Sequence, residues 1–103
     1  MGHHPGPGRD RGPAAGLRLA DLTPGLGKYF GAGSGVLVLR APAGDAFGLV
    51  DGDVIRSIGG RAPTDHRHAR RILASYAPGE VVRIEVLRDR KARRLEVTLP
   101  AAD

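Results

Sequence analysis

The serine and histidine residues of this chain do not stand at the spacings that enzymes use for catalysis. None of the three serines, Ser34, Ser57 and Ser75, lies in a Gly-x-Ser-x-Gly elbow, and there is no cysteine. Neither His66 nor His68 has an evident serine and carboxylate partner in the sequence. The sequence therefore predicts a chain that is not an enzyme.

Two pairs of side chains have types that bind metal ions. His3 and His4 are adjacent near the N-terminus with no acidic residue or cysteine at ligand spacing, so we interpret them as the remnant of an expression tag. Asp51 and Asp53 flank a glycine, but the other ligands of a calcium loop are missing. An Asp between a Gly and a strand usually caps a turn. We expect no metal and no other cofactor.

The glycine-rich stretches resemble nucleotide-binding loops only superficially. Residues 25–27 and 31–35 contain no complete Gly-x-Gly-x-x-Gly fingerprint, and no Lys-Ser/Thr pair follows them. We interpret them as connections between structural elements.

The length and composition indicate one small domain. The chain has 103 residues and a net charge of +5, and 14 of its 16 basic residues are arginine. No apolar run approaches the ~20 residues that cross a bilayer. We expect a disordered leader over residues 1–13, which are rich in Gly and Pro, a domain over 14–100, and a flexible tail over 101–103.

The first half of the domain predicts short strands and a short helix. Leu17 and Leu19 alternate with Arg18 and Ala20, which predicts a half-buried strand. Thr23-Pro24 is typical of a helix start, and the following apolar residues, Leu26, Tyr29 and Phe30, predict one buried helix face. Residues 36–39 form an apolar run that predicts a central strand covered on both faces.

The second half predicts the main helix and a hairpin. After a strand that includes Val54, Ile55 and Ile58, Asp65 is a candidate N-cap for a helix over residues 66–76. Its expected buried residues are Ala69, Ile72, Leu73 and Tyr76. Alternation over 82–86 and 95–99 predicts two strands of a β-hairpin. The expected fold is α+β: a small β-sandwich or partly open barrel of five to six strands, with one main helix and one or two short helices.

Residues 48–60 carry the most specific pattern, a Gly-Asp turn that leads into an apolar strand and ends at Gly59-Gly60. This stretch resembles the G-L-x-x-G-D-x-I-x-x-(I/V)-x-G core of PDZ domains. Residues 22–31 resemble the L-T-P-x-L-x-x-Y-F-G insert of bacterial members, and residues 88–91 resemble their R-D-G-K turn. The order of these pieces is similar to the circularly permuted bacterial type found in HtrA/Deg-like and related envelope proteases.

The resemblance implies a peptide-binding groove between a strand at residues 16–21 and the helix at 66–76. Peptide C-termini, or extended internal segments, would add to this strand by β-augmentation. The expected binding residues are Ala14, Ala15, Gly16, Leu17, Arg18, Leu19, His66, Arg70 and Leu73. The resemblance also implies a protease domain in the parent chain and a location in the periplasm or cell envelope.

Each part of the implied groove has an expected role. The loop that ends at Gly16 would offer backbone N–H groups to a carboxylate. Leu17, Leu19 and Leu73 would line a pocket for the last ligand side chain. His66 would select Ser or Thr two residues before the ligand's end, and Arg70 would favour an acidic ligand side chain. A shift of the helix by two residues would place His68 in the position of His66.

Two alternative functions follow, one from a departure from the family pattern and one from the basic charge of the last hairpin. Ala15 stands where the family usually has a larger apolar residue, which favours an assembly domain with an unused groove as one alternative. The other is an electrostatic binder of anionic surfaces through the basic hairpin at 88–94. Nucleic acid is a weaker expectation, because we assign Tyr29, Phe30 and Tyr76 to the core and leave only Phe47 to stack on bases.

Overall fold

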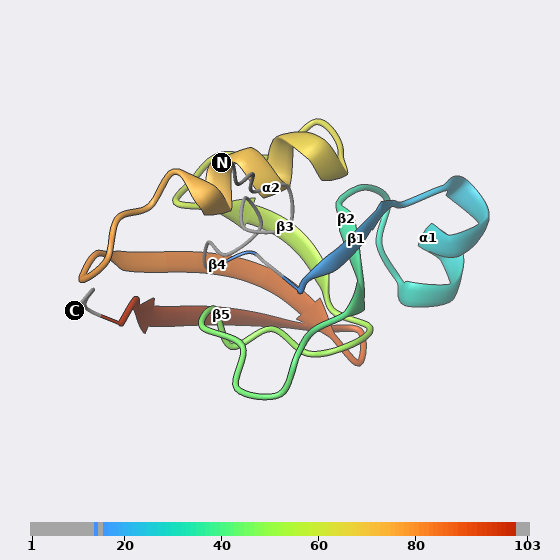
Figure 1. The fold of residues 1–103 in the computed structure, drawn as a ribbon. Coiled ribbons are helices and arrows are strands. Elements are labelled where there is room, and N and C mark those ends of the chain that lie inside the picture. The colour runs from blue at the N-terminus through green and yellow to red at the C-terminus, as the bar shows by residue number, and fades with distance from the viewer. Residues whose placement is uncertain (1–13, 15, 101–103) are drawn as a thin grey trace, which may run out of the picture.

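A computed structural model describes Ala14 and residues 16–100 of the chain. The expected leader and tail and the loop residue Ala15 lie outside the described residues. The strands are β1 (Arg18–Asp21), β2 (Val36–Arg40), β3 (Val54–Ile58), β4 (Val81–Arg88) and β5 (Lys91–Thr98). They form one antiparallel sheet in the order β1-β2-β3-β4-β5, shown in Figure 1. Helix α1 (Pro24–Phe30) follows β1, and α2 (His66–Ala74) follows β3. This confirms the predicted α+β fold.

The sheet buries apolar side chains on both of its faces. Two neighbouring rows of cross-strand partners show this: Val36, Ile55 and Val86 in one row, and Leu37, Val54 and Leu87 in the next. Because side chains alternate along a strand, the two rows point to opposite faces. The first row belongs to the main core, and the second forms a smaller cluster.

Helix α2 covers the main core, as its sequence pattern predicts. The Asp65 side chain caps it by accepting the His68 N–H at 2.8 Å, and this bond holds the pKa of Asp65 below its ordinary value. Ala69, Ile72 and Leu73 are buried. The helix ends at Ala74, two residues before the expected end, and Tyr76 packs against the core from the turn that follows.

Helix α1 starts where predicted, but its predicted apolar face is wrong. Thr23 accepts the Leu26 N–H at 3.2 Å, and Pro24 is the first helical residue. The residue that α1 buries is Gly27, where a Cβ would collide with the Ala32 carbonyl. Leu26 and Tyr29 are exposed. The reason is position, because α1 projects from one end of the sheet and only Phe30 reaches the smaller cluster (Figure 1).

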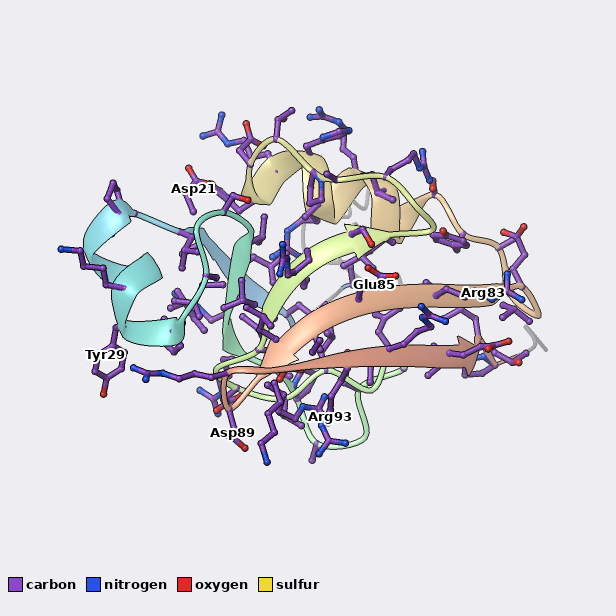
Figure 2. The ribbon with its side chains drawn as sticks, turned by 180° about the vertical axis from the view of Figure 1, so that it is seen from behind. Asp21, Tyr29, Arg83, Glu85, Asp89 and Arg93 are labelled. Atoms are coloured by element: carbon purple, nitrogen blue, oxygen red, sulfur yellow. The ribbon has the colours of Figure 1, made fainter. Side chains whose placement is uncertain are left out.

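Phe47 and Tyr29 show the reverse of their expected burial. Phe47 is fully buried in the main core, whereas Tyr29 is 72% exposed and its side chain points outward in Figure 2. Leu39, expected to be covered, is also exposed, because the β1–β2 pairing passes from Arg40 to Val38 and leaves Leu39 without a partner in the register. Neither described helix has the length and apolar character needed to cross a membrane.

A buried ion pair joins the turn before β3 to the end of β4. Asp53 is fully buried, and Arg88 donates to both of its oxygens, from Nε at 2.9 Å and from Nη2 at 2.8 Å. The Val50 N–H also donates to Asp53 at 3.0 Å, and Arg88 donates to the Gly48 carbonyl at 3.1 Å. The hydrogen bond to Asp53 raises the pKa of Arg88 above its ordinary value. Every charge of this pair is therefore matched by a partner.

The pair predicts a large loss of stability in Asp53→Ala. Removing one partner of a buried pair costs about 3–5 kcal/mol, a large part of the ~5–15 kcal/mol that holds a small domain together. Urea unfolding measures the change in the free energy of unfolding. Arg83→Ala is the matched control, because its pair with Glu96 (3.5 Å) is exposed and worth at most about 1 kcal/mol. Equal losses in the two variants would contradict the assignment, and Arg88→Lys provides a milder variant if Asp53→Ala does not fold.

Asp45 holds the turn between β2 and β3 at a cost in desolvation. Its Oδ2 accepts the N–H groups of Phe47 and Leu49 at 3.1 and 3.0 Å, while its Oδ1 is buried without a hydrogen-bond partner in the described part of the chain. Burial raises the pKa of Asp45 above its ordinary value, against the lowering effect of the two N–H groups. Ionisation of the Asp45 carboxyl group is therefore less favourable in the folded protein than in the unfolded chain.

This shift predicts how Asp45→Asn changes with pH. Because the folded protein binds the Asp45 proton more tightly, the wild type carries a penalty at neutral pH that disappears as the pH falls through the raised pKa and below the unfolded value. The Asn variant has no such penalty. Its stability relative to wild type should be most favourable at neutral pH and should decline on acidification to about pH 3. Urea unfolding of both proteins across this range measures the difference, and a difference independent of pH would refute the shift.

Candidate functional site

Strand β1 supplies a sheet edge for a binding site. It pairs with β2 only, so among the described residues the N–H and C=O groups on its other side have no neighbouring strand. Helix α2 contacts β1, and it bonds to Asp21 at the end of the strand and to Leu17 just before it. An extended peptide could therefore add to β1 in the space between the strand and the helix.

The loop before β1 is a tight turn that requires glycine. The Leu17 N–H donates to the Ala14 carbonyl at 3.2 Å, which closes the turn, and Gly16 has a φ of +89°. Glycine adopts this left-handed conformation without strain, whereas other residues do so rarely. The turn leaves Gly16 exposed at the start of β1, which is where the carboxylate site was expected.

The start of α2 is tied to the end of β1. The His66 N–H donates to Asp21 Oδ1 at 2.8 Å, and Figure 2 shows Asp21 beside this end of the helix. His66 is the first helical residue. The competing candidate His68 accepts the Thr64 N–H through Nδ1 at 3.0 Å, so its ring is engaged by the turn before the helix. The described register therefore places His66, and not His68, at the helix start.

Arg70 connects the middle of α2 to the loop. It donates from Nη1 to the Ala14 carbonyl at 3.0 Å and from Nη2 to the Leu17 carbonyl. The sequence favoured a role for Arg70 toward an acidic ligand side chain, and no sequence pattern indicated this contact across more than 50 residues of chain. The guanidinium therefore lies at the loop end of the space between β1 and α2.

The three leucines expected to form a pocket lie in the main core. Leu17, Leu19 and Leu73 are 2%, 8% and 0% exposed. They form an apolar floor under the edge of β1 and not an open pocket, so a ligand side chain would enter only after these side chains adjust. Arg18 alternates with them and is exposed.

The structure thus brings most of the expected residues together. Ala14, Gly16, Leu17, Leu19, Arg70 and Leu73 surround the loop end of the site, and His66 lies at the opposite end next to Asp21. Asp21 was missed in the sequence, although an acidic residue at the end of a predicted edge strand is a signal that could have suggested a contact with a helix N-terminus.

A large hollow of the described surface lies elsewhere. It has a volume of about 670 Å³ and is lined by residues of α1 and of the β4–β5 turn, among them Tyr29, Leu87 and Arg90. Two of its charged groups, Asp53 and Arg88, already bind one another. We take the edge of β1 beside α2 as the candidate functional site, because unpaired edge groups and an apolar floor meet there.

Comparison with solved structures finds the same fold in HtrA-type proteases. The HtrA-type protease AlgW, solved with a decapeptide, matches with 30% identity and a TM-score of 0.64 over 85% of this chain. A variant of AlgW, also with a decapeptide, matches with 28% identity and a TM-score of 0.73 over 85%. The chain spans 29% and 28% of the AlgW chain in these two structures, less than a third of its length.

A single-domain structure matches over most of its length. The HtrA3 PDZ domain bound to a phage-derived ligand, FGRWV, is 23% identical with a TM-score of 0.65, over 81% of this chain and 80% of that one. The comparison with curated proteins found no match. The sequence model of the PDZ domain matches residues 13–99. With its edge strand, its glycine turn and its covering helix in this arrangement, the chain belongs to the PDZ domain family.

Proposed function

We propose that this PDZ domain is a peptide-binding module, without catalysis of its own, that captures C-terminal or extended internal segments by strand addition. The ligand would lie along β1, opposite α2. The observation that carries the proposal is the edge of β1, which faces α2 above the apolar floor of Leu17, Leu19 and Leu73. Main-chain hydrogen bonds to the edge would supply affinity, and the side chains beside it would supply selectivity.

The related structures support a peptide as the ligand. Both AlgW structures contain a decapeptide, and the HtrA3 PDZ domain binds a five-residue ligand. We further propose that the domain regulates, or tethers substrates to, a protease domain of a longer bacterial protein in the cell envelope. The match to less than a third of the HtrA-type protease AlgW, in two structures, motivates this part. Protease activity of the full-length parent, with and without this domain, tests it.

A pair of peptides tests whether the site requires a free C-terminal carboxylate in its ligand. We expect FGRWV with a free carboxylate to shift the amide resonances of Gly16, Leu19 and the start of α2 in an NMR titration, and the amidated peptide to bind at least about tenfold more weakly, because a charge-assisted bond is lost. Equal binding would indicate internal segments as ligands. No shift by either peptide at millimolar concentration would contradict the proposal and favour an assembly domain with an unused groove, for which light scattering should show self-association.

A third peptide in the same titration tests His66. It carries Thr in place of Arg, two residues before the end. We expect tighter binding by roughly fivefold if the His66 ring bonds the hydroxyl, the size of one neutral hydrogen bond. His66→Ala should remove this preference and His68→Ala should keep it, because the His68 ring is held by Thr64. Loss of the preference in both variants would point to a change in the helix and not to His66.

Exposure of Tyr29 favours a second candidate, the binding of an anionic surface. The ring is exposed next to Arg90, whose Nη2 donates to the Tyr29 carbonyl at 2.9 Å. Further along β5, Arg93 is exposed. Arg94 Nη2 lies 3.8 Å from Glu85 Oε2, and this negative charge weakens the positive electrostatic field around Arg94. If this surface functions, retention on a polyanion column should fall steeply with salt and be lost in Arg93→Ala/Arg94→Ala. Absence of retention at low salt would remove this candidate.

A further inference from the structure

We propose that Arg70 is the charged member of the carboxylate site: it holds the turn closed between Ala14 and Leu17 and supplies the positive charge that distinguishes a free C-terminus from an internal segment. The proposal rests on the proposed function and names the residue that selects its ligand. It replaces the role toward an acidic ligand side chain that the sequence favoured for Arg70.

The turn and the helix are joined through shared carbonyl oxygens. The Ala14 carbonyl accepts both the Leu17 N–H, at 3.2 Å, and Arg70 Nη1, at 3.0 Å. A carbonyl oxygen has two lone pairs, so both bonds can form together. Arg70 Nη2 donates to the Leu17 carbonyl at the other end of the same turn. A single half-buried guanidinium thus spans the turn, and its position is determined by α2.

The charge of Arg70 is what this loop otherwise lacks. Residues 14–17 are Ala, Ala, Gly and Leu, and the neighbouring Arg18 is exposed. The two carbonyl oxygens at the ends of the turn carry partial negative charge and would repel a carboxylate. A guanidinium bonded to both offsets that charge, and these bonds use only two of its five N–H groups. Arginine is also the side chain best suited to a carboxylate, because its fork can donate two parallel bonds.

The contact with the Leu17 carbonyl is compatible with a bound strand. This carbonyl faces α2, since Arg70 reaches it, and therefore lies on the side of β1 where a ligand would add. Its second lone pair can accept the last N–H of a peptide while Arg70 keeps the first. The carboxylate that follows this N–H would then lie next to the guanidinium. Arg70 would act as a positioning residue for the turn and as a direct partner of the ligand.

The affinities of two peptides for four proteins test the role of the charge. Wild type, Arg70→Gln, Arg70→Lys and Arg71→Gln are titrated with FGRWV as the free acid and as the amide. Arg71→Gln is the matched control, because this exposed neighbour on α2 gives the same change in net charge. We expect Arg70→Gln to weaken the acid roughly tenfold and to change the amide by less than about twofold, and the control to change both by less than about twofold.

The lysine variant separates charge from geometry. Arg70→Lys keeps the charge but replaces the fork by an ammonium group, so it should retain more of the preference for the acid than Arg70→Gln. If Arg70 were only a structural tie, the acid and the amide would weaken equally in both variants. That result, or an unchanged preference in Arg70→Gln, would overturn the proposal while leaving the proposed function intact.

Hydrogen exchange without any peptide tests the effect on the turn. The Leu17 amide closes the turn, so it should exchange roughly tenfold faster in Arg70→Gln than in wild type or Arg71→Gln. Unchanged exchange would refute the positioning role. If wild type binds neither peptide, the proposed function and the carboxylate role both fail, whereas the exchange rates still decide whether Arg70 holds the turn.

Discussion

The buried pair between Asp53 and Arg88 is the interaction on which the rest of the fold depends. Asp53 precedes β3 and Arg88 ends β4, so the pair determines how the central strands and the long turn before β3 meet. A buried carboxylate is tolerated only when its oxygens are bonded, and here Arg88 and the Val50 N–H provide the bonds. The same guanidinium binds the Gly48 carbonyl, which connects the turn to the β4–β5 hairpin. The Gly-Asp signature of the family therefore has a structural role in this chain.

The candidate site depends on this ion pair indirectly. The main core places α2 over the sheet through Ala69, Ile72 and Leu73, and two polar contacts then attach the helix to both ends of β1. At one end Asp21 accepts the His66 N–H, and at the other Arg70 binds the carbonyls of the turn. Apolar packing alone has little directional preference, whereas these hydrogen bonds specify where the helix lies along the strand. The position of α2 relative to β1 is thus determined by side chains that also border the candidate site.

The strands, the caps and the main helix could be predicted because their signals are local. Asp65 and Thr23 cap the residues that immediately follow them, and the β4–β5 pairing follows from alternation on both sides of a short turn. The predictions that were wrong concern burial, which depends on what other parts of the molecule surround a residue. The spacing of Leu26, Tyr29 and Phe30 predicts a buried helix face, yet α1 projects beyond the sheet and offers the core mainly Phe30. Phe47 lies in a turn with no periodic pattern, and its complete burial follows from the path of that turn beneath the core.

The family, the order of the elements and the residues of the candidate site could be predicted from the sequence alone, because glycine turns, caps and alternating patterns act between neighbours in the chain. What those residues contact depends on how the chain folds in three dimensions. Arg70 and Asp21 are ordinary charged residues in the sequence, and their partners lie 53 to 56 and 45 residues away. Such contacts arise when the core brings distant segments within hydrogen-bond distance, and no local spacing encodes that distance.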